Sequence, residues 1–137
     1  MESKKFIEEV TYEIIGSAIE VHKIMGRGLL ENVYQMCMEE EMELRGLTFD
    51  TELKIPVIYK SKSLNIDFRC DFFIEQCIVL ELKAVKEIVS LYEAQVLTYM
   101  HLLQAPKGIL LNFASQNIFK DGQKTFVNEY FRSLPDE

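Results

Sequence analysis

The chain has 137 residues, of which 48% are hydrophobic and 27% charged, and this favours one globular domain spanning residues 1–137 rather than a disordered chain. Its net charge of −7 argues against a protein that holds nucleic acid by bulk electrostatics, because that mode needs an excess of Lys and Arg. An enzyme is not excluded, since a metal ion and a few local cations can neutralise a phosphate in a cleft.

Cysteine usage and hydropathy restrict the compartment. The three cysteines, Cys37, Cys70 and Cys77, form no Cys-x-x-Cys motif, which argues against a disulfide framework or a zinc finger. Free thiols are typical of a reducing cytosol. The first ten residues lack the apolar region of a signal peptide, and no apolar run is long enough to span a bilayer. We therefore expect a cytoplasmic protein with no membrane partner.

The first part of the chain predicts two helices. Apolar residues recur every three or four positions from Ser3 to Met25, with Ser3 as the N-cap and Gly26-Arg27-Gly28 as the stop. A second helix is expected from Leu29 to Gly46. Its inward stripe is predicted to consist of Leu30, Val33, Tyr34, Cys37 and Leu44.

After the second helix the hydrophobic period changes from 3.6 to 2, which predicts strands. Residues 53–59 form an expected edge strand, because Pro56 is unsuited to a central strand. A long strand follows at residues 64–74. Its alternation places Cys70 on one face, with Phe72 and Ile74, and Asp71 on the other face.

A turn at Glu75-Gln76 leads into a third strand, Cys77 to Ala84, so that the strands form a meander. Ser90 is predicted to cap a helix over residues 91–103, with Glu93 completing a capping box. A fourth strand is expected at residues 107–113.

In the tail, Asp121-Gly122 resembles a hairpin turn, and Val127 to Phe131 fits a strand or a short helix. The order α-α-β-β-β-α-β predicts an α/β domain. Its mixed sheet should have four strands, or slightly more, flanked by helices.

Two charged residues interrupt the otherwise apolar third strand. Glu81 and Lys83 are two positions apart and therefore project from the same face. Asp71, on the preceding strand, is expected to lie level with them. Two neighbouring carboxylates repel each other unless a proton or a cation lies between them, and Mg²⁺ is a common partner of such oxygen ligands. A simple Glu–Lys pair at a sheet end is the alternative explanation.

The arrangement of Asp71 and Glu81-x-Lys83 resembles the PD-(D/E)XK nuclease superfamily. Residues 28–34, Gly-Leu-Leu-Glu-Asn-Val-Tyr, further resemble the signature of the GxxExxY proteins, a branch of that superfamily. Gln95 and Tyr99 are similar to the Gln-x-x-x-Tyr helix motif of RecB-like nucleases. The resemblance implies a restriction-endonuclease-like core and a nuclease-like domain.

The resemblance also implies roles for individual residues. Glu31, Asp71 and Glu81 correspond to metal ligands for Mg²⁺ or Mn²⁺, and Lys83 corresponds to the catalytic lysine. Gln95 corresponds to a residue that contacts substrate or orients the site. Tyr99 shares the helix face of Gln95, and Tyr34 shares that of Glu31, so both are candidate substrate contacts.

Two positions depart from the family pattern. Cys70 stands where the motif name has proline before the aspartate, and Arg27 stands where relatives often have proline between two glycines. Strand alternation places Cys70 on the face opposite Asp71, so the first change is expected to leave the ligand in place. The second is expected to loosen the loop that presents Glu31.

The remaining candidates are less specific. His22 suits either a partly buried histidine or a phosphate contact. Arg69 suits a phosphate contact or a salt bridge to Asp67 or Glu81. Four lysines form either a solvated rim or the border of a nucleic-acid groove: Lys54, Lys60, Lys62 and Lys86.

Two functions remain open on this basis. The first is a metal-dependent nuclease that hydrolyses DNA or RNA phosphodiester bonds. The second is a non-catalytic module on the same fold that binds nucleic acid or another protein, with a homodimer supplying the surface that a small acidic domain lacks.

Overall fold

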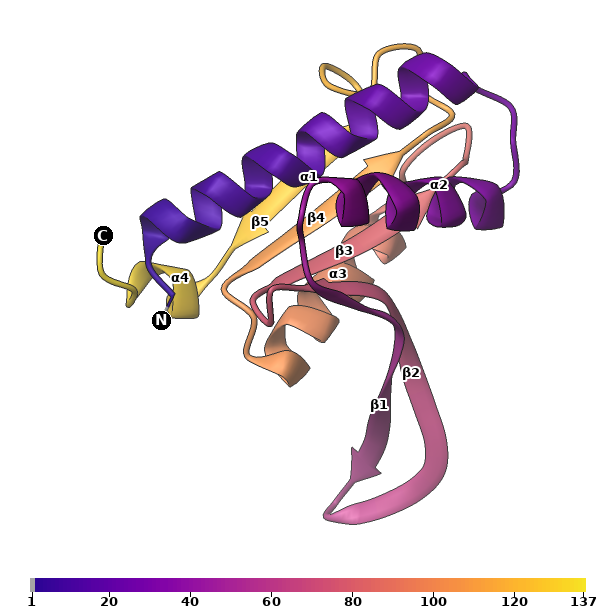
Figure 1. The fold of residues 1–137 in the computed structure, drawn as a ribbon. Coiled ribbons are helices and arrows are strands. Elements are labelled where there is room, and N and C mark those ends of the chain that lie inside the picture. The colour runs from indigo at the N-terminus through magenta and orange to yellow at the C-terminus, as the bar shows by residue number, and fades with distance from the viewer. Residues whose placement is uncertain (1) are drawn as a thin grey trace.

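Two long helices pack together over one face of the sheet (Figure 1). The computed structural model describes residues 2–137. Helix α1 (Lys4–Met25) begins as predicted, since the Ser3 hydroxyl accepts a hydrogen bond from the Phe6 N–H at 3.1 Å. It ends at Gly26, which has a φ of +73° that favours glycine.

Helix α2 (Glu31–Leu44) forms where expected, and its predicted inward stripe is right for Tyr34, which is buried, but wrong for Leu30 and Leu44. Leu30 and Leu44 are each 74% exposed, because Leu30 precedes the helix and Leu44 is its last residue. The buried stripe is Tyr34, Met38 and Met42, which are spaced by four residues and so share one helix face.

The sheet has five strands in the order β1-β2-β3-β4-β5. Their bounds are β1 (Phe49–Tyr59), β2 (Lys62–Ile74), β3 (Ile78–Lys83), β4 (Lys107–Asn112) and β5 (Gln123–Val127). Neighbours are antiparallel except β3 and β4, which run parallel. The mixed sheet, the meander and the edge position of β1 are confirmed.

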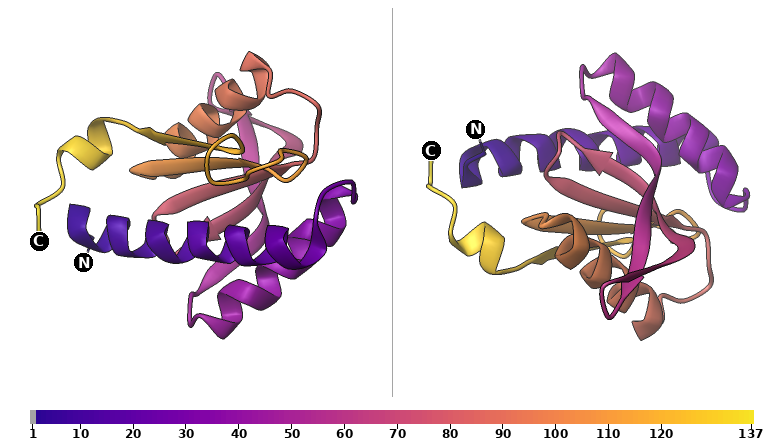
Figure 2. Two further views of the ribbon diagram at one scale, coloured as in Figure 1. Left: turned by 90° about the horizontal axis from the view of Figure 1, so that it is seen from above. Right: turned by 90° about the horizontal axis from the view of Figure 1, so that it is seen from below.

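Helix α3 (Ser90–Leu103) connects the two parallel strands and covers the opposite face of the sheet from α1 (Figure 2). The predicted Ser90 cap is wrong. Val89 is the N-cap, it makes no side-chain cap, and Ser90 is already helical.

The tail differs from its prediction in one respect. The segment from Phe113 to Gly122 forms a ten-residue loop rather than a two-residue hairpin turn at Asp121-Gly122. Strand β5 follows this loop, and a four-residue helix, α4 (Glu129–Arg132), begins after the Asn128 cap. Of the two alternatives for Val127 to Phe131, the short helix is the one that forms, since only Val127 belongs to β5.

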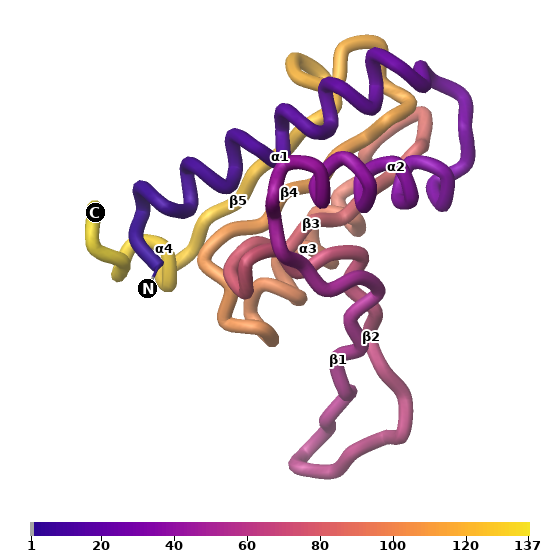
Figure 3. Tube along the Cα trace, in the orientation of Figure 1, coloured from indigo at the N-terminus to yellow at the C-terminus, as the bar shows by residue number. Residues whose placement is uncertain are grey.

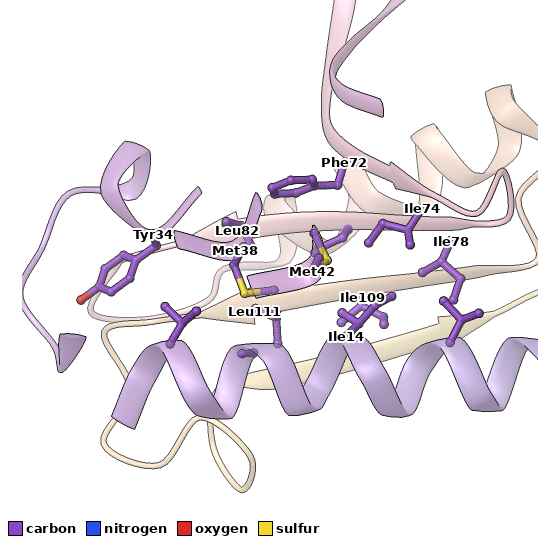
Figure 4. Packing of buried hydrophobic residues seen from close by; sticks show 14 of the residues in the cluster. Ile14, Tyr34, Met38, Met42, Phe72, Ile74, Ile78, Leu82, Ile109 and Leu111 are labelled. Atoms are coloured by element: carbon purple, nitrogen blue, oxygen red, sulfur yellow. The ribbon is translucent and has the colours of Figure 1, made fainter. Parts of the chain in front are cut away.

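The core has one layer on each face of the sheet. Figure 4 shows the layer under α1 and α2, which contains Ile14, Met38, Phe72 and Leu111, with Tyr34 at one end of it. The second layer lies under α3 and has the following buried members: Ile55, Cys70, Phe73, Val79, Val96, Tyr99, Met100, Ala105 and Leu110. Strand β3 alternates between these layers, so Glu81 and Lys83 share the α3 face with Val79.

Strands β1 and β2 continue beyond the body of the sheet as a two-stranded hairpin (Figures 1 and 3). We call residues 54–69 the hairpin arm. Ile55 and Phe68 at its base pack into the α3 layer, whereas the residues from Ile58 to Asp67 are all exposed. Within residues 2–137, every helix is too short or too polar to cross a membrane.

Candidate active site

The site is built where β2 separates from β3. Their ladder ends at the pair Phe72–Leu80, and the next position on each strand carries an acid, Asp71 or Glu81. Beyond this pair, side-chain carboxylates accept hydrogen bonds from the backbone N–H groups of the two strands. Glu81 Oε2 accepts from the Asp71 N–H at 2.6 Å, and Asp71 Oδ2 accepts from the Leu82 N–H at 2.8 Å. The two acids are therefore held beside each other by reciprocal bonds to the backbone.

Burial makes this pair electrostatically unfavourable. Glu81 is 5% exposed, and burial together with the charge of Asp71 raises its pKa to about 8. Burial also raises the pKa of Asp71, and the charge of Glu31 adds to that effect. At neutral pH the pair thus favours either a retained proton or a cation brought close to it.

Lys83 supplies one positive charge to this group. Its charge opposes the raised pKa values of both Asp71 and Glu81. The ammonium lies 4.6 Å from the centroid of the Tyr92 ring, a cation–π contact that fixes the side chain against α3. Tyr92 was not identified from the sequence, because an aromatic residue in the first turn of a helix carries no signal of this contact.

Glu31 comes to the same group from the other helical layer. It is the first residue of α2, and its Oε2 accepts from the Ala84 N–H at 3.2 Å, directly after β3. Its side chain is exposed. The structure therefore brings Glu31, Asp71, Glu81 and Lys83 to the carboxyl end of β3.

Tyr34 anchors the loop that presents Glu31. Its hydroxyl donates to the Gly26 carbonyl at 2.6 Å and accepts from the Leu29 N–H at 3.2 Å. The ring is fully buried and stacks on Phe113 with centroids 4.5 Å apart. The structure thus places Tyr34 inside the core, where it faces the loop rather than the solvent.

Helix α3 contributes Tyr99 to the site. Tyr99 is 7% exposed, and its pKa is raised by burial and by the charges of Glu81, Cys70 and Asp71. Its ring lies 6.1 Å from that of Phe68 at the base of the hairpin arm. Gln95 lies one turn earlier on the same helix and is partly exposed.

Cys70 does not face away from the acids as expected. It lies in the α3 layer with Phe73 and Tyr99, whereas Phe72 lies in the opposite layer. The expected alternation fails next to a gap in the β1–β2 pairing, since Glu52 and Asp71 are left out of the paired residues and Glu52 has a φ of +46°. Burial and the charges of Glu81 and Asp71 raise the pKa of the Cys70 thiol far above its usual range.

Two other predicted contacts lie outside this group. The His22 Nε2 is 2.9 Å from the Ser115 carbonyl, in the loop after β4. Arg69 forms an exposed ion pair with Glu52 at 3.2 Å, rather than with Asp67 or Glu81. His22 therefore supports a loop, and Arg69 lies two residues from Asp71 at the base of the hairpin arm.

Asn112 is a positioning residue that sequence reasoning missed. It is 6% exposed and pairs with Lys83 across the parallel strands. Its amide donates to the Val85 carbonyl at 2.9 Å, and its Oδ1 accepts from the N–H groups of Val85 and Ala114 at 3.1 and 3.2 Å. These bonds hold the segment that leaves β3. A polar residue at the end of an apolar strand was the available signal.

The donor set suits a hard divalent cation, since three carboxylates provide the oxygen ligands that Mg²⁺ and Mn²⁺ prefer. The backbone bonds use one oxygen each of Asp71 and Glu81. Among the described residues, however, no three His, Cys, Asp or Glu side chains are grouped closely enough to hold a metal as they stand. A complete ligand set therefore requires side-chain adjustment.

Comparison with known proteins identifies the fold. A family model described as the PD-(D/E)XK nuclease superfamily matches residues 8–126, which include every residue of the site. No curated protein matches the chain. The solved structure titled "Crystal structure of SSO0001" is similar, with a TM-score of 0.58 and 20% identity over 74% of this chain. The match covers 55% of that protein. At 20% identity the likeness concerns the fold alone, which is restriction-endonuclease-like.

Proposed function

The chain belongs to the PD-(D/E)XK nuclease superfamily, and from this premise we propose that it hydrolyses phosphodiester bonds in nucleic acid with Mg²⁺ or Mn²⁺. The observation that carries the proposal is the reciprocal pair formed by Asp71 and Glu81. Its two buried carboxylates stand beside Lys83 and need a counter-charge. A purely structural Glu–Lys pair would not require the second buried acid.

Each side chain of the site has a role in this proposal. Asp71 and Glu81 would hold the ion, and Glu31 would add a third carboxylate. When bound, the ion would polarise a phosphoryl oxygen and acidify a water molecule. Lys83 orients the attacking water and stabilises negative charge that develops on the phosphate. Gln95, which is partly exposed one helical turn before Tyr99, contacts the substrate.

We further assign the chain to the GxxExxY branch. The three signature residues act as one unit, which supports this assignment. Gly28 has a φ of +89° in the loop, Tyr34 binds that loop on either side, and Glu31 follows it at the start of α2. We place the activity in the cytoplasm, where three free cysteines are stable.

The test is a cleavage assay with labelled single- and double-stranded DNA and RNA, with Mg²⁺ or Mn²⁺. We expect Asp71→Asn, Glu81→Gln and Lys83→Met each to lower the cleavage rate by about 100-fold or more, as removal of one transition-state contact commonly does. Glu40→Gln is the matched control, since Glu40 is exposed on α2. Unchanged cleavage in the Asp71 and Glu81 variants would refute the proposal.

Calorimetry separates the nuclease from the non-catalytic module. The nuclease requires Mg²⁺ or Mn²⁺ binding that Glu81→Gln weakens and Lys83→Met retains. Nucleic-acid binding without uptake of either ion would instead identify a binding module, in which a homodimer could supply the contact surface.

A further inference from the structure

The hairpin arm exposes apolar side chains that the rest of the described chain, residues 2–137, leaves uncovered. Ile58, Tyr59 and Ile66 are each about 60% exposed, at 58%, 62% and 61%, and Leu64 lies among them at 41%. A two-stranded ribbon gains little stability by itself in water. Clustered exposed apolar groups are typical of contact surfaces. The arm is therefore built to meet something outside the chain.

The charge of the hairpin arm identifies what it meets. Four cations lie on it, against the single carboxylate of Asp67: Lys54, Lys60, Lys62 and Arg69. The net charge of the arm is +3 in a chain of net charge −7, so the remaining residues carry −10. A basic ribbon on an acidic body is the electrostatic footprint of an element that contacts a polyanion.

The cations are also arranged at a cost. Lys54 and Arg69 are directly opposite each other in the β1–β2 register, and like charges in that relation repel. Glu52 pairs with Arg69, at 3.2 Å, in an exposed and therefore weak ion pair. Lys60 lies in the turn and Lys62 directly follows it, with the Lys60 ammonium 5.7 Å from the centroid of the Tyr59 ring. A phosphate backbone would relieve this repulsion.

We propose that the hairpin arm docks on duplex DNA, with its lysines on the phosphates and its exposed apolar side chains against the groove. This inference rests on the proposed nuclease function. B-DNA has a major groove wide enough for a two-stranded β-ribbon, whereas the major groove of A-form RNA is too narrow. Strand β2 runs directly from the arm to Asp71, so a duplex held by the arm is guided toward the carboxylates.

The alternative occupant of the arm is a second copy of the chain. Two arms placed against each other would bring charges of +3 together, which disfavours a symmetric contact between them. The phosphates of DNA have no such penalty. The charge distribution therefore favours DNA.

The binding test uses fluorescence anisotropy with a labelled DNA duplex, in EDTA so that cleavage cannot occur, across a salt series. The variant is Lys54→Ser, Lys60→Ser and Lys62→Ser together. Its matched control replaces three exposed lysines of the body by serine: Lys5, Lys23 and Lys120. We expect the arm variant to lose roughly 10- to 100-fold in affinity, and its salt dependence to fall by about two to three units of slope.

The outcomes separate the two proposals. The docking role would be overturned if the arm variant and the body control lost DNA affinity equally, or if the wild type bound no duplex. Neither result would decide whether the protein cleaves nucleic acid. Arm-dependent binding without cleavage in Mg²⁺ would overturn only the nuclease. A fall in sedimentation mass for Ile58→Ser with Tyr59→Ser, with DNA affinity unchanged, would show that the arm joins two copies instead.

Discussion

Glu81 is the residue in which fold and function oppose each other most directly. It is buried on a central strand, yet it carries a carboxyl group that would be ionised in water at neutral pH. Burial comes first among the causes of its raised pKa, and Asp71 comes second. A carboxylate in this position costs stability and is therefore better explained by ligand binding than by folding.

The pH dependence of stability follows from this conflict. The pKa of Glu81 is about 8 in the folded protein, against 4.5 for an ordinary Glu. The folded state therefore binds more protons between these values, and stability falls as pH rises through that window. The free energy of unfolding of the wild type should fall by roughly a few kcal/mol between pH 5 and 8, since one pKa unit is worth about 1.4 kcal/mol. Glu81→Gln should not show this fall. Urea unfolding in EDTA measures this loss.

The control for that measurement is Glu40→Gln, which removes an exposed carboxylate and should retain the wild-type pH profile. Adding Mg²⁺ at pH 8 should restore part of the stability of the wild type but not of Glu81→Gln, because an ion that binds only the folded state stabilises it. A wild-type profile in Glu81→Gln would mean that Glu81 ionises without cost.

At the scale of elements, the loop between α1 and α2 determines where Glu31 stands. Gly26 and Gly28 both have positive φ, and the Tyr34 hydroxyl bonds to the loop at two points. Arg27, between the glycines, donates to the Ala114 carbonyl at 2.8 Å and so ties the loop to the end of β4. The loop is therefore held at both ends, which compensates for the missing proline.

Tyr34→Phe tests this positioning, because it keeps the stacked ring and removes only the hydroxyl. Loss of two loop bonds should lower the free energy of unfolding by about 1–3 kcal/mol. We also expect weaker Mg²⁺ binding, since Glu31 would be less well placed, and an unchanged KM for nucleic acid. Calorimetry and steady-state kinetics provide these readouts. A raised KM with normal Mg²⁺ affinity would instead mark Tyr34 as a substrate contact.

Local patterns predicted the elements well, and they failed where tertiary contacts decide. The periodicity of α1 and the Ser3 cap are properties of adjacent residues and were confirmed. The orientation of Cys70 was not, because Cys70 lies next to the gap in the β1–β2 pairing at Glu52 and Asp71, where Glu52 has a positive φ. Strict alternation assumes an uninterrupted ladder. Sites are often built where that assumption fails.

The same reasoning explains what could be predicted of the site. Glu81 and Lys83 were found because charges are conspicuous in an apolar strand, and Asp71 because the preceding strand was expected to bring it level with them. Tyr92 and Asn112 were missed because their roles depend on contacts with residues 9 and 27 positions away, Lys83 and Val85. Tyr34 was expected on the face of Glu31, but a shared helix face does not reveal that one side chain is buried and the other exposed.

At the scale of the whole molecule, the proposed active site and the proposed docking surface lie on different parts of the fold. The acidic body holds the carboxylates, and the hairpin arm holds four of the fifteen cations of the chain. The net charge of the chain argued against electrostatic binding of nucleic acid. That sum does not show how the charges are distributed, and so it does not reveal the basic arm. Beyond its base, moreover, the arm contributes little to the core, since none of residues 57–66 belongs to either layer.

Trimming the arm tests this separation. Replacing residues 57–66 by Asn-Gly would join Pro56 to Asp67, which already pair, through a favoured two-residue turn. Because the removed segment is outside the core, the free energy of unfolding should change by no more than about 1 kcal/mol, and Mg²⁺ affinity should be retained. Duplex affinity should fall, with Lys60 and Lys62 removed. Loss of Mg²⁺ binding, or a free energy of unfolding lower by several kcal/mol, would show that the arm also supports the point where β2 separates from β3, at Asp71 and Glu81.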